Sequence, residues 1–226
     1  MSTASVVADN LSAEARRTIR DLLVALAESK NFLGFQYASW CICGPSIEAN
    51  IALAGMAQEE LGHAGVMGGL LGEDLKHGVP GKDTVVTWNK WSDQSAASAP
   101  FRMIEAWPEM IVACLALDAT ATATLEALKS STYLRLAQRA TKMVQEEQFH
   151  LMFGVETVRT FAALPRETRQ RLAADYQRAL GEAEARLASV ETLSRLTALG
   201  MLAPGALGAR AEFLQGVTRR LDDAWG

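Results

Sequence analysis

Residues 56–65, MAQEELGHAG, and residues 143–152, MVQEEQFHLM, carry the same short motif. In each stretch a glutamate is followed three positions later by a histidine, which gives the pairs Glu60 and His63, and Glu147 and His150. Residues three positions apart lie on one face of an α-helix, about 5–6 Å from each other. A carboxylate and an imidazole at this spacing can reach a common partner. The two motifs therefore predict two helices that each present a Glu-x-x-His pair.

The rest of the chain is also predicted to be helical, because alanine, leucine and glutamate are abundant and runs of β-branched residues are few. Six helices are expected, at about residues 11–41, 46–72, 100–129, 131–163, 166–199 and 206–224, and the third of them begins at either Pro100 or Pro108. Ser46 is the expected N-cap of the second helix. Residues 73–100 are rich in Gly, Pro, Ser and Asp and predict a long crossover, and residues 1–10 predict a flexible N-terminus. We expect one domain over residues 1–226.

Each of the first four helices has an apolar seam of the kind that faces a bundle core. Ionisable side chains interrupt all four seams near their midpoints, namely Lys30, then Glu60 and His63, then Asp118, and then Glu147 and His150. Burying lone charges costs several kcal/mol each, and a bound cation is the usual compensation. Di-iron carboxylate bundles have a Glu-x-x-His on two helices and a carboxylate on each of the other two, and ferritin-like bundles have one long crossover.

These observations predict an all-α, ferritin-like four-helix bundle with a long crossover between helices two and three and extra C-terminal helices. The predicted metal ligands are Glu60, His63, Asp118, Glu147 and His150. Glu59 and Glu146 each precede a predicted ligand, so we expect them to face sideways, either behind the ligands or in solvent.

Other classes of protein are disfavoured by composition. The net charge of −4 argues against a general nucleic-acid surface. No run of about 20 uninterrupted apolar residues is present, so no membrane span is expected. The three cysteines, Cys41, Cys43 and Cys114, form no CxxC pair and predict a reducing cytoplasmic location without disulfides.

Residues 39–64, SWCICGPSIEANIALAGMAQEELGHA, resemble the ferritin-like subunits of bacterial phenylacetyl-CoA monooxygenase, which are the catalytic oxygenase subunit and its structural paralogue. These proteins carry a Trp and a Gly/Ala-Pro pair before the second helix, followed by Glu-x-Gly-His. The stretch KMVQEEQFHLMFG, residues 142–154, matches as well, and the likeness covers about residues 15–160. The resemblance implies two irons, with five of the six ligand positions filled by the predicted ligands.

The sixth ligand position of that family is a glutamate on the first helix, and it falls here on Lys30, or on Asn31 with a shift of one residue. Four carboxylates would balance two divalent ions, whereas three carboxylates and a protonated Lys30 balance one. A neutral Lys30 could instead bind a metal, and a carbamylated Lys30 would restore the missing carboxylate. Lys30 could also be a salt-bridge partner of a core carboxylate without a chemical role.

The leading functional prediction is a non-haem iron oxygenase or hydroxylase that activates O2 and acts on a small apolar or aromatic substrate, with Lys30 taking part in the chemistry. One or two irons per chain are expected, with manganese as an alternative metal. A coenzyme A thioester substrate is implied by the resemblance only. Electrons would come from a separate reductase, because no flavin or nicotinamide fingerprint is present. We expect a homo-oligomer or a hetero-oligomer.

Two alternatives remain open. The first is a non-catalytic structural subunit of a hetero-oligomeric oxygenase, a role that Lys30 favours and the five retained ligand-type residues oppose. The second is an oxidoreductase with a single metal or a lysine-modified centre.

Overall fold

The computed structural model of the protein describes residues 11–73, 104–187 and 189–225. Over these residues the chain forms α-helices and one short 3-10 helix and contains no strand, so the predicted all-α class is confirmed. The expected flexible N-terminus, residues 1–10, lies outside the described residues, as do residues 74–100 of the expected crossover.

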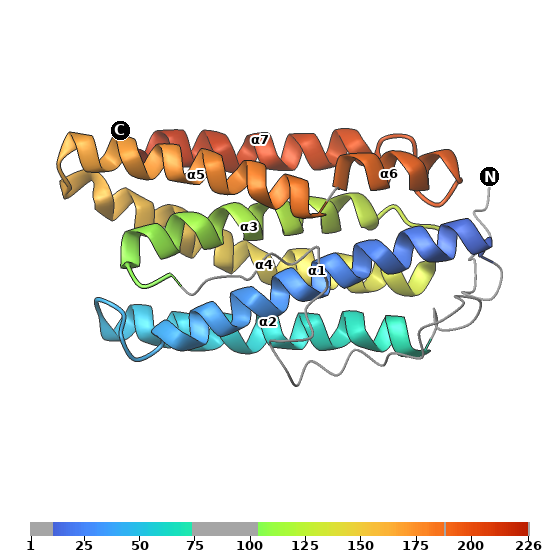
Figure 1. Ribbon diagram of the computed structural model, residues 1–226, viewed down its shortest axis with the longest axis horizontal. Coiled ribbons are helices and arrows are strands. Elements are labelled where there is room, and N and C mark those ends of the chain that lie inside the picture. The colour runs from blue at the N-terminus through green and yellow to red at the C-terminus, as the bar shows by residue number, and fades with distance from the viewer. Residues whose placement is uncertain (1–10, 74–103, 188, 226) are drawn as a thin grey trace.

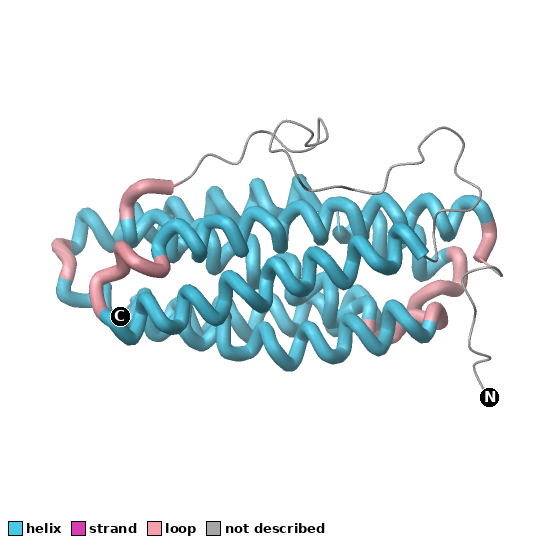
Figure 2. The backbone as a smooth tube through the Cα atoms, turned by 90° about the horizontal axis from the view of Figure 1, so that it is seen from below, coloured by secondary structure: helices cyan, strands magenta, loops and turns pink. Residues whose placement is uncertain are grey.

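Four long helices form the bundle: α1 (Ala13–Trp40), α2 (Ile47–Glu73), α3 (Trp107–Leu128) and α4 (Leu134–Thr160). They run side by side along the long axis of the molecule (Figure 1; Figure 2). Helix α1 packs mainly on α2, and α3 packs on α4 within the bundle. This arrangement confirms the predicted ferritin-like bundle.

Local side chains fix where the bundle helices begin. The Ser12 hydroxyl accepts a hydrogen bond from the Ala15 backbone N–H at the start of α1, at 3.1 Å. The Ser46 hydroxyl does the same for the Ala49 backbone N–H at the start of α2, also at 3.1 Å, so the predicted N-cap is confirmed. Pro108 lies in the first turn of α3, where its missing N–H costs no intrahelical hydrogen bond.

The C-terminal part differs from the prediction in two places. The fourth helix ends at Thr160, and the 3-10 helix η3 (Phe161–Ala163) occupies its expected last turn. The expected single helix over residues 166–199 is two helices, α5 (Arg166–Leu187) and α6 (Ser189–Ala198). No Gly or Pro marks this division, so the sequence pattern carried no signal for it. Helix α7 (Ala206–Trp225) closely matches its prediction.

Helix α3 is the central element of the fold. It contacts α1 and α4 in the bundle, and α5 and α7 on the side opposite α2 (Figure 1). Among the described residues it is the one helix long and apolar enough to cross a membrane, but 89% of its most apolar stretch is buried inside the protein. Its apolar character is therefore explained by burial on all sides.

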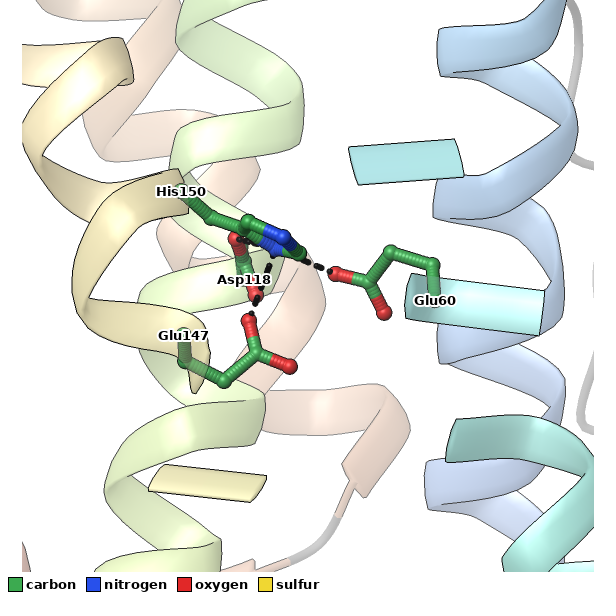
Figure 3. Close-up of side chains that lie close together, drawn as sticks. All are labelled: Glu60, Asp118, Glu147 and His150. Atoms are coloured by element: carbon green, nitrogen blue, oxygen red, sulfur yellow. Dashed lines mark hydrogen bonds and ion pairs between the residues drawn. The ribbon is translucent and has the colours of Figure 1, made fainter. Parts of the chain in front are cut away.

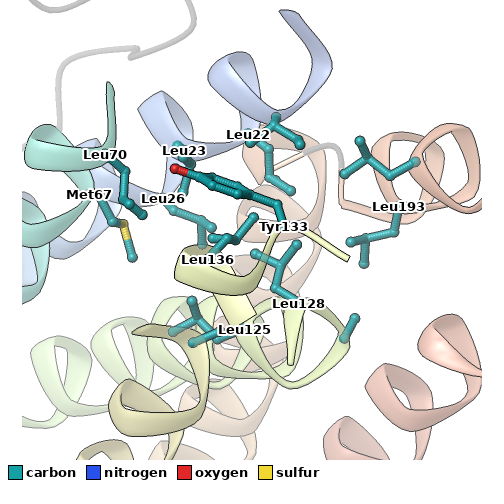
Figure 4. Packing of buried hydrophobic residues seen from close by; sticks show 14 of the residues in the cluster. Leu22, Leu23, Leu26, Met67, Leu70, Leu125, Leu128, Tyr133, Leu136 and Leu193 are labelled. Atoms are coloured by element: carbon teal, nitrogen blue, oxygen red, sulfur yellow. The ribbon is translucent and has the colours of Figure 1, made fainter. Parts of the chain in front are cut away.

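The core consists of two apolar clusters separated by a polar layer. One cluster contains Leu26, Met67, Leu125 and Met143 and includes Tyr133, which is surrounded by leucines of several helices (Figure 4). The other contains Leu33, Met56, Leu115 and Leu151. Lys30 follows Leu26 by one helical turn and precedes Leu33 by another. The ionisable residues thus form a layer across the middle of the bundle.

Candidate metal centre

The structure brings together all six ionisable residues that interrupt the apolar seams. Lys30 extends from α1, Asp118 from α3, and the two Glu-x-x-His pairs from α2 and α4. All six are buried, and His63 is the most accessible of them at 5%. Figure 3 shows Glu60, Asp118, Glu147 and His150 converging from three helices. Asn31, the alternative position on the first helix, is partly exposed.

The Lys30 ammonium lies among the three buried carboxylates. Its Nζ atom is 2.6 Å from Glu147 Oε1, 2.8 Å from Asp118 Oδ1 and 3.1 Å from Glu60 Oε1. Burial by itself lowers the pKa of Lys30, but the charges of Asp118, Glu147 and Glu60 outweigh this effect and raise the pKa well above its usual range. Both a metal-ligating and a carbamylated lysine require the neutral amine, so this environment opposes those two alternatives.

The two histidines contact the centre in a crossed pattern. Nδ1 of His63, on α2, lies 2.9 Å from Glu147 Oε1 on α4. Nδ1 of His150, on α4, lies 3.1 Å from Glu60 Oε1 on α2 and 3.6 Å from Asp118 Oδ2. Each imidazole thus reaches the carboxylate of the opposite motif, and His150 also contacts the carboxylate of α3.

The glutamates that precede the predicted ligands hold the outer nitrogens of the histidines. Glu59 Oε2 lies 2.8 Å from His150 Nε2, and Glu146 Oε2 lies 2.8 Å from His63 Nε2. Carboxylates in this position fix the tautomer and the orientation of a metal-binding imidazole. The sequence predicted either this role or solvation for both glutamates, and spacing alone could not show that each would hold the histidine of the other motif.

The electrostatic surroundings differ between the two motif glutamates. Burial raises the pKa of Glu60 to about 7, and the neighbouring Glu147 charge adds to the effect. Burial would also raise the pKa of Glu147, but Lys30, His150 and His63 together hold it well below its usual range. Burial lowers the pKa of both histidines, yet their carboxylate partners outweigh it and raise both values. The layer is therefore a dense set of mutually stabilised charges.

The donor atoms fit one metal ion. Single ligand atoms of Glu60, Asp118, Glu147 and His150 all lie within 4.8 Å of one another. Glu60 Oε2 and Glu147 Oε2 are buried without a hydrogen-bond partner. Glu147 Oε2 lies 3.0 Å from His150 Nδ1, which is within ion-pair distance, but the two atoms do not form a hydrogen bond. Buried carboxylate oxygens without a hydrogen-bond partner can act as cation ligands, and imidazole with carboxylates suits iron or manganese.

A second divalent ion does not fit as well. The Lys30 ammonium already contacts one oxygen of each of the three carboxylates. When both histidines are neutral, as metal binding requires, the three negative charges and this positive charge leave a balance for one divalent cation. The predicted ligand His63 lies outside the four-residue group, and its assignment as a ligand stays a prediction.

A cleft of about 210 Å³ lies between α2 and α4 and reaches the edge of this centre. Its lining includes His63 and the two outer glutamates, Glu59 and Glu146. The centre is thus approached from solvent on the side of His63.

Comparison with known proteins agrees with the sequence motifs. The sequence model of the family described as phenylacetic acid catabolic protein matches residues 2–224. A search of curated proteins found no match. The family match extends over nearly the whole chain, beyond the residues 15–160 over which the likeness was inferred, and it includes the C-terminal helices. The resemblance inferred from the two motifs is confirmed, and the chain belongs to the family of phenylacetic acid catabolic proteins.

Proposed function

We propose that this protein is a non-haem iron oxygenase that activates O2 and hydroxylates or epoxidises a small apolar or aromatic substrate. One observation carries the proposal: a buried group of three carboxylates and a histidine has two oxygens without hydrogen-bond partners, in a chain of a phenylacetate-catabolic family. A group that only stabilised the bundle would be expected to satisfy its buried oxygens.

In this proposal Glu60, Asp118, Glu147 and His150 hold the iron, and the bound iron supplies the reductive activation of O2. Glu59 keeps the His150 ring in place through the 2.8 Å contact at Nε2. The two apolar clusters on either side of the polar layer exclude water from the centre. The chain itself thus contributes ligand geometry, a dry environment and control of the histidine orientation.

Lys30 is assigned two roles in the proposed centre. Its ammonium neutralises part of the carboxylate charge, which reduces the expected content to one iron, or one manganese, per chain. It also keeps hydrogen-bond donors next to the metal ligands, at 2.6 to 3.1 Å from their oxygens. This direct contact with the ligands is the basis for treating Lys30 as part of the active site.

The remaining parts of the proposal follow from the family. The substrate class includes aromatic acyl compounds such as coenzyme A thioesters, and electrons come from a separate reductase. We also propose that the chain works as one domain, in a homo- or hetero-oligomer, in the cytoplasm.

Metal analysis and an oxygenation assay test this function together. Iron-loaded protein is mixed with O2, phenylacetyl-coenzyme A and excess ascorbate, which supplies the two electrons that each oxygenation requires, and the product is analysed by mass spectrometry for incorporation of one oxygen atom. We expect about one iron per chain and an oxygenated product that is lost in Asp118→Asn. Iron-loaded protein that leaves the thioester unchanged would reject this substrate class, and absence of bound metal would reject the oxygenase.

A non-catalytic subunit of a hetero-oligomeric oxygenase is the second candidate. The observation that favours it is the set of three ion pairs made by Lys30, which balances much of the carboxylate charge without a metal. In that case the wild-type protein binds no iron, and Lys30→Glu binds none either.

A further inference from the structure

Helix α2 forms one edge of the bundle, on the side away from the C-terminal helices (Figure 1). Among the described residues it packs mainly on α1 and less on α4. An uncharged stripe, here called the α2 stripe, runs along its outward face. Its members, each three, four or seven residues after the last, are Ile47, Ile51, Gln58, Gly62, Gly65 and Gly69. This spacing places them on one side of the helix, where all are exposed except Gly69, which is half-buried.

The α2 stripe is unlike an ordinary solvent-facing helix surface. Ile47 and Ile51 have 65% and 67% of their surface exposed. A surface helix carries charged residues on its outer side, as α5 does with the exposed Arg166, Glu167 and Arg171. An exposed face that has isoleucines and lacks charges is typical of a surface that another protein covers.

The large and small members of the stripe are separated along the helix. Both isoleucines lie in its N-terminal half, and the three glycines lie in its C-terminal half. A Cβ atom at Gly62, Gly65 or Gly69 would meet no described atom within 4 Å, so open space lies over the glycines. A second copy of α2 that ran antiparallel could place its Ile51 over Gly65. In the same register its Ile47 would lie over Gly69, and by symmetry each copy would fill the open space of the other.

The polar residue of the stripe fits the same register. Gln58 lies midway between Ile51 and Gly65, so the two-fold axis would pass beside it. A glutamine amide both donates and accepts hydrogen bonds, so the two Gln58 side chains can pair with each other. In a parallel arrangement isoleucine would face isoleucine and glycine would face glycine, which would leave gaps along the interface.

Charges beside the stripe also favour the antiparallel orientation. The exposed Glu48 and Val66 are 18 residues apart, about five helical turns, and therefore lie on the same flank of α2. This flank faces α4, because Val66 lines the cleft together with Lys142. In the antiparallel register Glu48 of the second copy would lie level with Gly68 and near Lys142, whose side chain is 68% exposed. Opposite charges at a rim add little affinity but select one orientation, whereas parallel packing would bring the two Glu48 carboxylates together.

We infer that α2 is the interface of a symmetric homodimer, in which two copies of this chain pack antiparallel along the α2 stripe. The inference deepens one part of the proposed function, since it selects the homo-oligomer, and it requires neither a bound metal nor turnover. It assigns the partner, the contact surface and the register.

Sedimentation velocity of the full chain tests the dimer and its surface. We expect the wild type to have the mass of two chains at micromolar concentration. Ile51→Glu should raise the dissociation constant at least about 100-fold, because each dimer loses two buried isoleucines. The matched control is Val190→Glu on α6, at a position that is 52% exposed and lies outside the stripe. It should stay within about threefold of the wild type, and circular dichroism checks that both variants remain helical.

Disulfide crosslinking tests the register. Single cysteines are placed at Gln58 or Ile51 in a background that carries Cys41→Ser and Cys43→Ser, so that the remaining native cysteine, Cys114, is buried. Gln58→Cys should crosslink two chains under mild oxidation with copper phenanthroline, because the pair lies at the two-fold axis. Ile51→Cys should not crosslink, because 14 residues of helix, or about 21 Å, separate the two cysteines in the antiparallel register.

A wild type with the mass of one chain would overturn the inference and leave the stripe to a different subunit. A dimer that Ile51→Glu leaves intact would overturn it too, and crosslinking of Ile51→Cys as efficient as that of Gln58→Cys would refute the antiparallel register. These failures are distinct from failure of the oxygenase. A monomer that oxygenates the thioester would refute the dimer alone, and a dimer through α2 that binds no iron would refute the oxygenase alone.

Discussion

Lys30 Nζ lies 2.6 Å from Glu147 Oε1, the shortest of the three ion pairs that this ammonium makes in the core. The two residues are 117 positions apart in the chain and are both fully buried. A buried charge is costly unless it is paired. We therefore expect the ion pairs of Lys30 to stabilise the metal-free bundle and, in the proposed metal centre, to limit the number of ions bound.

Lys30→Met should destabilise the metal-free protein, because three buried carboxylates would lose their shared cation. We expect the free energy of unfolding, measured in urea with a chelator present, to fall by about 3–5 kcal/mol. The control is Lys142→Met, which removes a lysine whose side chain is 68% exposed and should change stability by no more than about 0.5 kcal/mol. A loss below about 1 kcal/mol in Lys30→Met would contradict the role of the ion pairs.

Lys30→Glu should raise the metal content from about one to about two ions per chain. The substitution replaces a positive charge with a fourth carboxylate in the layer, and four carboxylates balance two divalent ions. Iron per chain, measured by elemental analysis after reconstitution, checks this expectation. Lys30→Met is the control, since it removes the charge without adding a ligand. Two irons in the wild type would refute the charge argument.

Glu59→Ala should weaken metal binding by about 10- to 100-fold, because Glu59 holds His150 Nε2 at 2.8 Å. Glu146→Ala is the matched variant on α4, and it removes the same kind of contact from His63. If His150 is the metal ligand, Glu146→Ala should change the affinity much less. Co²⁺ titration measures the metal affinity of both variants. Equal losses of affinity would mean that both histidines bind the metal.

Gly154→Ala should destabilise the bundle by about 1–3 kcal/mol, because a Cβ atom there would lie 2.8 Å from Leu115 Cδ1 in the packed core. Gly181→Ala is the control on α5, where a Cβ atom meets nothing within 4 Å. Alanine should stabilise that exposed helical position by about 0.4–1 kcal/mol. Thermal unfolding of both variants measures the difference, and a Gly154→Ala protein as stable as the wild type would mean that Leu115 can move aside.

Tyr176 predicts a loss of stability at alkaline pH. Burial, with a smaller effect of the nearby Asp222 charge, raises the pKa of Tyr176 to about 12 from its ordinary value near 10. The neutral phenol is favoured in the folded state, so its contribution is fully present below pH 10 and is lost as the pH rises towards 12. At pH 11 the loss should be roughly 1.4 kcal/mol.

The measurement for Tyr176 is urea unfolding at pH 9 and pH 11 for the wild type and Tyr176→Phe. The wild type should lose more stability than the variant between the two pH values. Equal losses in both proteins would show that Tyr176 does not titrate with a raised pKa.

The sequence by itself determined the helical class, the bundle seams and the residues that interrupt them. These features are local, because the spacing of residues along one helix fixes which side chains share a face. Glu60 and His63 had to lie on one face of α2 once that helix formed, and Ser46 had to precede its first turn.

Only the tertiary structure decided how the helices meet. The choice between Lys30 and Asn31, the contact of Lys30 with three carboxylates, and the crossed pairing of Glu59 with His150 all depend on the register between helices. The end of α5 at Leu187, with α6 beginning at Ser189, depends in the same way on packing instead of a Gly or Pro. Register is set by the summed packing of many side chains along whole helices, and no single spacing in the sequence records it.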